Sequence, residues 1–555
     1  MNDKNGLLVH PKAVEPQTIV LSILVSIFSA IICMQIISKL GFTPNTSIIG
    51  AMIAMSIARI PLKGLQSFRS LDRQNLVQTM TSAAGFGAAN CTLLAVAIFF
   101  AYGDLSLAIP MLIGSGLATL IGMHMVYQCY DSELYPASAS WPPGVATATA
   151  IVAGDEGGKK GKHLLWGIIL GIIGSSKYIA IKAIGLKGLP MAGVGIAFFA
   201  NPVAMIALAA GLLLRGYFPQ ISFLFAPIAK LFGSELPTNL GATYIPHGFM
   251  IGAGLISLIQ AIATIVKGTR RSPAVGKTVE TKEAAGYTVT PKQLNKALVT
   301  HVGLFAVGAL LMAIISGILG EMSVGKIIIW VIWCTFSAAV APILVGLSAM
   351  HSGWFPGFAV SIIFVSLGLF MGFPPQALIL LTGYVASTGP CFADMGYDLK
   401  TGWIIRGRGE NKDYELAGRK QQMISELMGG VIAVIVTAAL MNMHFKLGMI
   451  PPVSKVFAAT IQAGAQPEIL RQMFISAIFG AALQAVGGAK RSIGILFATG
   501  LLINNPIYGI GLLVALLIRW PLEKKYKGEL EIWGGGFVAG DGIYGFIDAL
   551  IRLAA

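Results

Sequence analysis

The sequence predicts an all-α polytopic membrane protein with about 14–16 transmembrane helices in two similar halves, some of them broken or re-entrant. Composition carries this prediction. Hydrophobic residues make up 55% of the 555 residues and charged residues only 11%, whereas a soluble domain has about 25% charged residues. Glycine and proline are abundant, with 67 and 26 residues, which is reasonable for helices in a bilayer. A soluble enzyme and a disordered chain are therefore both excluded.

Apolar runs fix the order of the expected elements. The first span, at 18–39, is long enough to be a retained helix rather than a cleaved signal peptide. A second apolar run ends near residue 59. The later apolar runs are at 76–102, 106–129, 164–186, 191–214, 248–266, 297–319, 325–348, 354–371, 375–389, 422–443, 469–486, 492–518 and 536–553. The expected domains are a cytoplasmic tail at 1–17, a first transmembrane half at 18–266, a cytoplasmic linker at 267–296 and a second half at 297–555.

The net charge of +15 is interpreted as a topology signal, because lysine and arginine collect in the cytoplasmic loops of membrane proteins. The polar linker at 267–296 is rich in both residues. Basic stretches at 159–163, 400–420 and 519–527 are expected to be loops on the same side. Both termini are then cytoplasmic, and no nucleic-acid partner is expected.

A weak internal repeat supports the prediction of two halves. Residues 41–44 (Gly-Phe-Thr-Pro) resemble 372–375 (Gly-Phe-Pro-Pro), and residues 73–80 resemble 420–427. Many secondary transporters consist of two related halves that hold the substrate near the middle of the membrane. The alternative explanation is chance similarity between apolar sequences.

Amide side chains mark the start of two expected helices. Gln74, Asn75 and Gln78 precede or open one apolar run, and Gln421 and Gln422 occupy the matching place in the second half. Gln74 and Gln78 share a helical face at i, i+4. An amide both donates and accepts hydrogen bonds, which suits a peptide backbone or an amino-acid-like ligand. The alternative role is hydrogen bonding between helices.

Four carboxyl groups lie in or beside apolar runs, where a charged group needs a functional reason. Asp394 and Asp398 share a helical face, with Lys400 as an expected counter-charge. Glu426 lies about one turn inside an apolar helix, and Asp541 lies in a Gly-Asp-Gly segment. Such carboxyls could carry a coupling proton or bind a cationic group of the substrate. The alternatives are an interfacial ion-pair cluster and a carboxylate that stabilises a helix start.

Proline and glycine interrupt several expected helices. Trp141 and Gly144 belong to a Trp-Pro-Pro-Gly segment, Trp354 and Gly357 to a Trp-Phe-Pro-Gly segment, and Asn505 precedes a proline. Broken backbone at membrane depth is tolerated where it is buried in protein or lines a cavity. The N-terminus of a half-helix also offers free N–H groups to a carboxylate. These segments predict a substrate path, and ordinary helix kinks are the alternative.

Motifs of other function classes are absent from the sequence. It has no GxxxxGK[ST] P-loop, no HExxH motif and no GxSxG elbow, so we expect neither an ATP-driven motor nor an enzyme. The five cysteines show no CxxC spacing, and His124 has no second histidine at helical spacing. We therefore expect no cofactor and no metal site. A passive channel and an intramembrane enzyme are the less favoured classes.

In four segments the sequence resembles the oligopeptide transporter family, including its yellow-stripe-like branch. They are 73–79, Trp141-Pro142-Pro143-Gly144, 398–402 with 420–422, and 537–542, within a likeness that runs from about 18 to 550. Pro143 stands where this family usually has serine, which puts a hydroxyl contact there in doubt. The resemblance implies a proton-coupled importer, and the short N-terminus and loops suggest a prokaryotic member in the bacterial inner or plasma membrane.

We therefore expect a secondary active transporter for proton-coupled uptake of short oligopeptides or peptide-like compounds. The alternative substrates are metal complexes of amino-acid-derived chelators. The expected substrate-binding residues are Gln74, Asn75, Gln78, Trp141, Gly144, Trp354, Gly357, Tyr397, Gln421, Gln422 and Asn505, and the expected proton-coupling residues are Asp394, Asp398, Glu426 and Asp541. The expected partners are this substrate, protons and the lipid bilayer. The sequence does not determine the oligomeric state.

Overall fold

Helices make up nearly all of the regular structure of this protein. The computed structural model describes the chain except for residues 1–8, 42, 44–45, 48–49, 52–53, 55–68, 140, 156–158, 177–179, 182–185, 200, 226, 228–238, 272–285, 353–354, 356, 465–466, 489–490, 492, 503 and 555. The described part contains eight helices that are long and apolar enough to cross a membrane, and four shorter apolar helices. The prediction of an all-α polytopic membrane protein is confirmed, and the count of 14–16 spans stays a prediction.

The chain forms two compact units, and each takes segments from both halves of the sequence. Unit 1 comprises residues 1–31, 45–156 and 259–448, and unit 2 comprises 32–44, 157–258 and 449–555. Helices α1 (Pro16–Leu40) and α11 (Ile245–Arg271) contribute to both. The expected domains instead divided the chain into two consecutive halves, at 18–266 and 297–555. Those domain limits and the internal repeat stay predictions.

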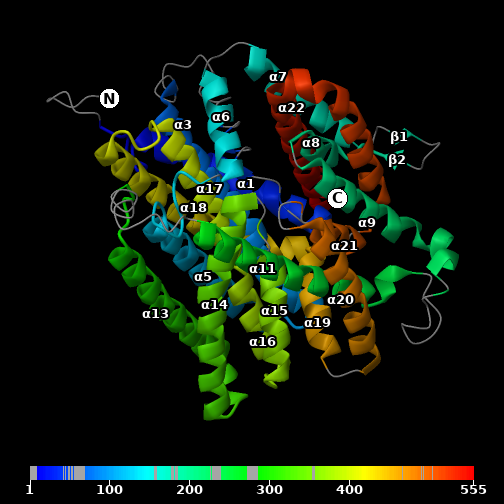
Figure 1. Cartoon of the computed structure of the whole chain (residues 1–555). Helices are drawn as coiled ribbons and strands as arrows, with labels where there is room; N and C mark the ends of the chain where they lie inside the picture. The colour runs from blue at the N-terminus through cyan, green and yellow to red at the C-terminus, as the bar shows by residue number, and fades with distance from the viewer. Residues whose placement is uncertain are drawn as a thin grey trace. The chain divides into compact units, whose positions relative to one another are not determined.

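Unit 1 holds the helices that surround the candidate site. They are α3 (Leu71–Phe86), the π-helix η2 (Gly87–Leu93), α4 (Leu94–Tyr102), α5 (Ala108–Cys129), α6 (Pro142–Asp155), α13 (Pro291–Ser316), η7 (Ile318–Gly320), α14 (Val324–Ser352), α15 (Gly357–Phe370), α16 (Pro375–Ala386), α17 (Thr388–Ile405) and α18 (Lys412–Lys446). Within it, α17 packs against α3, α5, α6 and α14, and α18 packs against α3 and α5. Figure 1 shows α17 and α18, in yellow-green and yellow, next to α3 and α6.

Unit 2 is built around a long, kinked helix. Its elements are α7 (Lys159–Ser175), the short hairpin β1 (Ala180–Ile181) and β2 (Leu186–Lys187), α8 (Met191–Phe199), α9 (Pro202–Ile221), η4 (Ser222–Phe225), η6 (Leu240–Ala242), α19 (Pro452–Ala463), α20 (Pro467–Gly487), α21 (Ile493–Leu502) and α22 (Pro506–Ala554). Helix α22 is kinked at Tyr526 and packs against α7, α8 and α9.

Local sequence explains where several helices begin. Thr290 and Gln293 form a capping box at the start of α13, and Pro291 occupies its first turn. Helix α6 begins at Pro142 and α15 at Gly357, which are the two broken segments that the sequence analysis identified. The interruption before Pro506 likewise separates α21 from α22. These positions are confirmed as helix starts.

Three expectations about loops are wrong. The stretch 400–420 is largely helical, because α17 continues to Ile405 and α18 already begins at Lys412. The stretch 519–527 lies within α22, and the stretch 159–163 forms the start of α7. Long basic side chains lie easily on a helix when their charged ends reach polar surroundings, so a basic run does not identify a loop. The short amphipathic helix α19 was not predicted.

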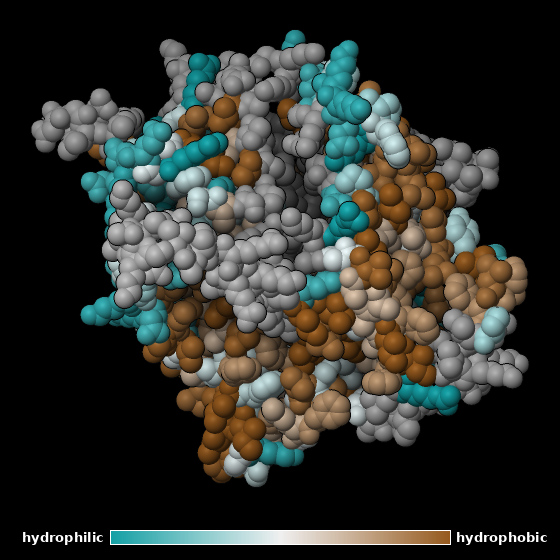
Figure 2. All heavy atoms as spheres, viewed as in Figure 1, coloured by the Kyte–Doolittle hydropathy of each residue, from teal (hydrophilic) through white to brown (hydrophobic). Residues whose placement is uncertain are grey.

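Hydrophobic side chains face outward on many of the helices. Ile328, Ile332 and Phe336 of α14 are exposed, as are Leu517 and Trp520 of α22. Figure 2 shows extensive hydrophobic surface, in brown, on the visible face. Exposed apolar surface of this extent fits helices that contact lipid. By contrast, α17 is buried at every position from Thr388 to Gly402, although its sequence contains two aspartates and a lysine.

Candidate functional site

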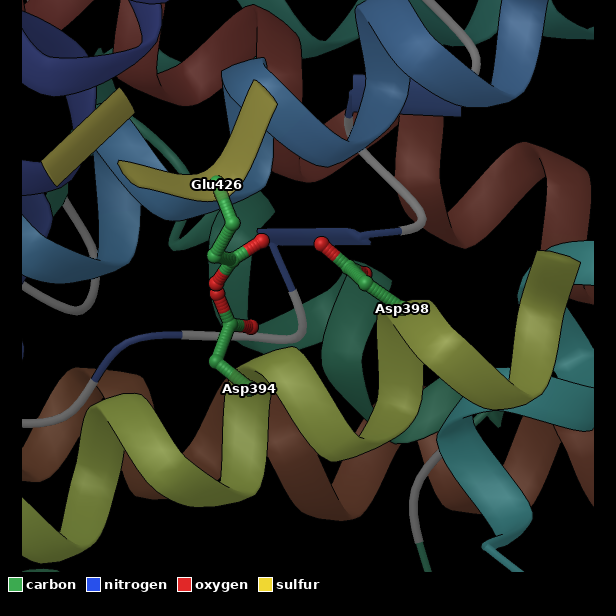
Figure 3. A group of neighbouring side chains, drawn as sticks. All are labelled: Asp394, Asp398 and Glu426. Carbon is green, nitrogen blue, oxygen red and sulfur yellow. The ribbon is translucent and has the colours of Figure 1, made fainter. Parts of the chain in front are cut away.

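Three buried carboxyl groups meet between α17 and α18. Asp394 and Asp398 lie one turn apart on α17, and Glu426 extends toward them from α18 (Figure 3). One carboxyl oxygen from each residue lies within 4.8 Å of the others. Asp394 and Asp398 are 1% exposed and Glu426 is fully buried. We call this group the carboxyl cluster; it unites three of the four predicted proton-coupling residues.

Hydroxyl groups hold the first member of the cluster. The Ser82 hydroxyl on α3 lies 3.0 Å from both carboxyl oxygens of Asp394, and the Thr46 hydroxyl donates to the same carboxyl over 3.3 Å. Both hydroxyl-bearing residues are fully buried. A carboxylate only accepts hydrogen bonds, so these contacts favour the ionised form of Asp394.

A similar pair of donors holds Asp398. The amide nitrogen Nε2 of Gln78 donates to Asp398 Oδ1 over 2.6 Å, and the Ser47 hydroxyl donates to the same oxygen over 2.5 Å. Glu426 differs from both aspartates, because neither of its carboxyl oxygens meets a donor in the described part of the chain. The three carboxyls are therefore not equivalent.

Basic residues do not balance the charge of the cluster within the described structure. Lys400, the expected counter-charge, donates to the carbonyl oxygen of Ala137 over 2.7 Å and lies 4.3 Å from the ring centre of Trp403. The expectation for Lys400 is therefore wrong. Three carboxyls at this spacing cannot all stay ionised in a buried site. Such a group can accept and release a proton, and oxygen ligands at this spacing also suit a hard cation.

A polar face of α3 extends from the cluster. Asn75, Gln78, Thr79 and Ser82 recur at the three- and four-residue spacing of one helical face. Asn75 is fully buried, and both its side-chain amide atoms lack a partner among the described residues. Gln74 is also buried, but its amide nitrogen reaches the Arg69 carbonyl over 3.4 Å. The structure thus brings Gln78 directly to the cluster and places Asn75 on the same face.

The two glutamines at the start of the second-half motif have different surroundings. Gln422 donates from Nε2 to the backbone carbonyl of Asp398 over 2.7 Å and accepts from Arg406 over 2.8 Å. Gln421 accepts a hydrogen bond from the Ala13 backbone N–H over 2.9 Å. Gln422 is therefore part of the site, whereas Gln421 binds the N-terminal segment.

The start of α6 packs against α17. The ring of Trp141 meets Tyr397 edge-on, with 6.1 Å between ring centroids. A Cβ added at Gly144 would lie 2.4 Å from the Tyr397 carbonyl oxygen, so only glycine permits this approach. The Gly144 N–H donates to the Trp141 carbonyl over 2.9 Å. The sequence analysis expected this N–H to bind a substrate carboxylate. That role stays a prediction, and the bond to Trp141 does not favour it because it already uses the N–H.

Other predicted site residues lie apart from these contacts. Gly357 begins α15, and a Cβ there would lie 3.1 Å from Pro390 at the start of α17. Trp354 lies outside the described residues. In unit 2, Asn505 accepts from the Tyr508 N–H over 3.1 Å in the first turn of α22. Asp541, also in unit 2, accepts a hydrogen bond from the Ser175 hydroxyl. Their predicted roles stay predictions.

The histidine that the sequence analysis noted has an unforeseen neighbour. His124 Nδ1 of α5 lies 3.0 Å from Nε2 of His301 on α13. His301 Nδ1 lies 2.6 Å from the Ala297 carbonyl oxygen, which only accepts hydrogen bonds. His301 Nδ1 therefore carries the hydrogen of the neutral ring, and His124 donates to His301 Nε2. The pair is explained as a hydrogen bond between two helices.

Sequence reasoning missed the hydroxyl groups of the site. Thr46, Ser47 and Ser82 all contact the aspartates, but serine and threonine are ordinary residues of buried membrane helices. One signal existed for Ser82, which lies four residues after Gln78 and therefore on the same helical face. Thr46 and Ser47 offered none.

The family assignment follows from a match that covers nearly the whole chain. The model of the family described as OPT oligopeptide transporter protein matches residues 15–243 and 238–552. The chain belongs to the OPT oligopeptide transporter family. No curated protein was found to match the chain. The match and the apolar helices together identify a multi-pass membrane transporter.

Proposed function

We propose that this OPT transporter takes up short oligopeptides, that proton flow drives the uptake, and that Glu426 carries the proton. Membership of the family supports peptides as the substrate class. The carboxyl cluster supports a titratable site in the interior of unit 1. We place the transporter in a bacterial cell membrane, as the resemblance described in the sequence analysis implies.

The observation that carries the proposal is the unequal supply of donors in the cluster. Asp394 and Asp398 each receive hydrogen bonds from two side chains, which stabilise a negative charge. Glu426 receives none in the described part of the chain. A protonated Glu426 has an O–H of its own, which can donate to either aspartate. One proton on Glu426 therefore satisfies the group that is otherwise left without a partner.

The surroundings of Glu426 contain few other groups that could exchange a proton. The titratable groups that face it are the carboxyls Asp394 and Asp398 of α17, and the thiols of Cys391 on α17 and Cys91 on η2. Among the described residues no lysine or arginine is bonded to these carboxyls. The proton affinity of Glu426 therefore depends mainly on burial and on the two aspartates.

The same cluster offers a binding site for one end of a peptide. With Glu426 protonated, the two aspartates keep two negative charges, and a free amino terminus would neutralise one of them. Gln78 lies beside Asp398, and Asn75 extends the polar face. Both amides can donate to and accept from a peptide backbone. We therefore assign the amino-terminal end of the substrate to this region.

The test is uptake by purified transporter in liposomes that are alkaline inside. A panel of labelled di-, tri- and tetrapeptides supplies the substrates. Glu426→Gln is expected to reduce gradient-driven accumulation by at least about tenfold. Exchange of peptide at equal pH on both sides is expected to continue, because a glutamine has the shape of a protonated glutamate. Glu410→Gln, at an exposed carboxyl between α17 and α18, is the matched control.

Three outcomes would overturn parts of the proposal. If Glu426→Gln accumulates peptide as fully as the wild type, Glu426 does not carry the coupling proton. If accumulation depends on a sodium gradient and not on the pH gradient, the coupling ion is sodium and not the proton. The same panel includes metal complexes of amino-acid-derived chelators. If only these complexes are taken up, they are the substrate and peptides are not.

A further inference from the structure

A second buried polar group lies between α17 and α18, and it contains balanced charges. Arg406 donates from Nε to Glu415 over 2.7 Å, and both side chains are at most 1% exposed. Arg419 donates to the same glutamate over 3.2 Å and lies 3.7 Å from Asp131. We call these four residues the arginine network. Two positive groups face two negative groups, so the network needs no additional ion.

Gln422 connects the arginine network to the carboxyl cluster. Its Oε1 accepts from Arg406 over 2.8 Å, while its Nε2 donates to the backbone carbonyl of Asp398 over 2.7 Å and reaches Thr79 over 3.2 Å. The side chain is fully buried. The Gln422 side-chain amide therefore links the charged Arg406 to the backbone of Asp398, which is a residue of the proposed coupling site.

A glycine makes room for this bridge. A Cβ added at Gly402 would lie 2.1 Å from Gln422 Oε1 and 2.4 Å from Arg406 Nη1. The Gln422 oxygen accepts from Arg406, and the planar Arg406 side chain is held through its Nε and Nη2, so neither group can move aside without breaking a contact. Any other residue at 402 would displace the arginine, the glutamine or α17 itself.

The arginine network also fixes the chain where the linker enters α13. The Thr288 hydroxyl donates to Asp131 over 2.7 Å and accepts from Arg419 over 2.9 Å. The Thr288 and Val289 backbone N–H groups donate to the side chain and the backbone carbonyl of Asp131. The contacts therefore run continuously from Thr288 through the two arginines to the Asp398 backbone.

We propose that Gln422 and Arg406 are positioning residues of the transporter, which set the distance between Asp398 and Glu426 by holding the α17 backbone. Neither residue bonds the Glu426 carboxyl. This inference rests on the proposed role of Glu426. If the bridge is lost, Asp398 moves away from Glu426, and Glu426 then binds its proton only at higher proton concentration.

The experiment compares the pH dependence of uptake in Gln422→Met and in the wild type. Methionine keeps the length of the side chain and removes all three of its hydrogen bonds, with Arg406, the Asp398 carbonyl and Thr79. The pH of half-maximal uptake is expected to fall by about one unit, because Glu426 without its close neighbour Asp398 binds the proton only at higher proton concentration. A merely structural role would lower the amount of folded protein and leave the pH profile in place.

Two further variants separate positioning from general damage. Gln484→Met removes another fully buried glutamine, whose Oε1 accepts from two backbone N–H groups in unit 2. It is expected to lower the melting temperature without moving the pH profile. The double variant Arg406→Gln with Glu415→Gln removes two opposite charges together, and is expected to fold and to show the same shift as Gln422→Met.

The inference fails if Gln422→Met keeps the wild-type pH profile, or if Gln484→Met moves the profile equally. Neither result affects the proposed function, which depends on Glu426→Gln. If Glu426→Gln loses accumulation and Gln422→Met keeps its pH profile, only the positioning role is wrong. If Glu426→Gln keeps full accumulation, the proposed function itself is wrong.

Discussion

The carboxyl cluster and the arginine network are two buried polar sites on the same pair of helices, and they differ in charge balance. In the network, each carboxylate of Glu415 and Asp131 faces an arginine. In the cluster, two of the three carboxyls receive hydrogen bonds from hydroxyl or amide groups, and the third, Glu426, lacks a donor among the described residues. A balanced site can hold a structure without any ligand. An unbalanced one depends on a proton or another cation, which makes it suited to transport.

The largest effect is expected from breaking the balanced site. Glu415→Gln leaves Arg406 and Arg419 facing each other without their shared carboxylate. Breaking a buried ion pair on one side costs about 3–5 kcal/mol, so the melting temperature in detergent should drop strongly. The control is Glu523→Gln, which removes a half-exposed partner of Arg519. Equal melting temperatures for Glu415→Gln and the wild type would show that the network does not hold the helices.

A smaller loss is expected from moving the helix that both sites share. Gly144→Ala would place a Cβ 2.4 Å from the Tyr397 carbonyl and 2.7 Å from the Lys400 Cβ, which pushes α6 away from α17. Overpacking of this kind costs about 1–3 kcal/mol. Gly303→Ala is the control, since nothing lies within 4 Å of the added atom. The melting temperature of Gly144→Ala should be lower than that of the wild type. The melting temperature of Gly303→Ala should be equal to that of the wild type or higher.

Neutralising the unbalanced site should leave stability almost unchanged. Glu426→Gln replaces the carboxyl that lacks a donor by a neutral amide, which can donate to Asp394 or Asp398 as a protonated glutamate does. The free energy of unfolding is expected to change by less than about 1 kcal/mol, or to rise. The contrast with Glu415→Gln is therefore sharp: one buried glutamate holds the fold and the other does not. A large destabilisation would mean that Glu426 is ionised and paired with a cation.

Sequence spacing predicted part of the candidate site well. Asp394 and Asp398 stand at i, i+4 on a helix, so their shared face followed from the sequence. Gln78 is separated from Asp398 by 320 positions, and its contact depends on tertiary packing alone. Asn505 was selected because it precedes a proline, but that position also suits a residue that bonds the first turn of a helix. Spacing within one helix is therefore predictable, whereas the choice between a local bond and a ligand is not.

The arginine network was missed because three of its four residues occur in a basic stretch that was interpreted as a loop. Arg406 is the first residue of the short connection between α17 and α18, and Glu415 and Arg419 lie inside α18. Charge composition alone cannot distinguish arginines in water from arginines that share a buried carboxylate. The all-α polytopic fold, by contrast, followed from hydrophobic length, since long apolar runs have few alternatives in a bilayer.

The smallest expected effect comes from an ion pair at the start of α3, which adds a partly exposed site to the comparison. Glu15 accepts from Arg73 Nε and Nη2 over 3.1 and 2.8 Å, and its side chain is 31% exposed. Burial raises the pKa of Glu15, but the hydrogen bonds from Arg73 and the Lys12 N–H outweigh it and hold this pKa below its usual value of 4.5. A lowered pKa means that the unfolded chain binds the proton more tightly, so this contribution is present above pH 4.5 and is lost as the pH falls through the folded pKa.

Because the pair still reaches solvent, the contribution of this pair to stability should be close to that of a surface pair, about 0–1 kcal/mol. Glu15→Gln is therefore expected to lower the melting temperature slightly at pH 7 and to match the wild type at a pH well below 4.5, where the wild-type glutamate is protonated as well. The difference in melting temperature at pH 7 should shrink as salt is added, because salt screens a pair that is partly exposed to solvent. A loss that is as large as that of Glu415→Gln, or that is independent of pH and salt, would show that exposure does not set the strength of ion pairs in this protein.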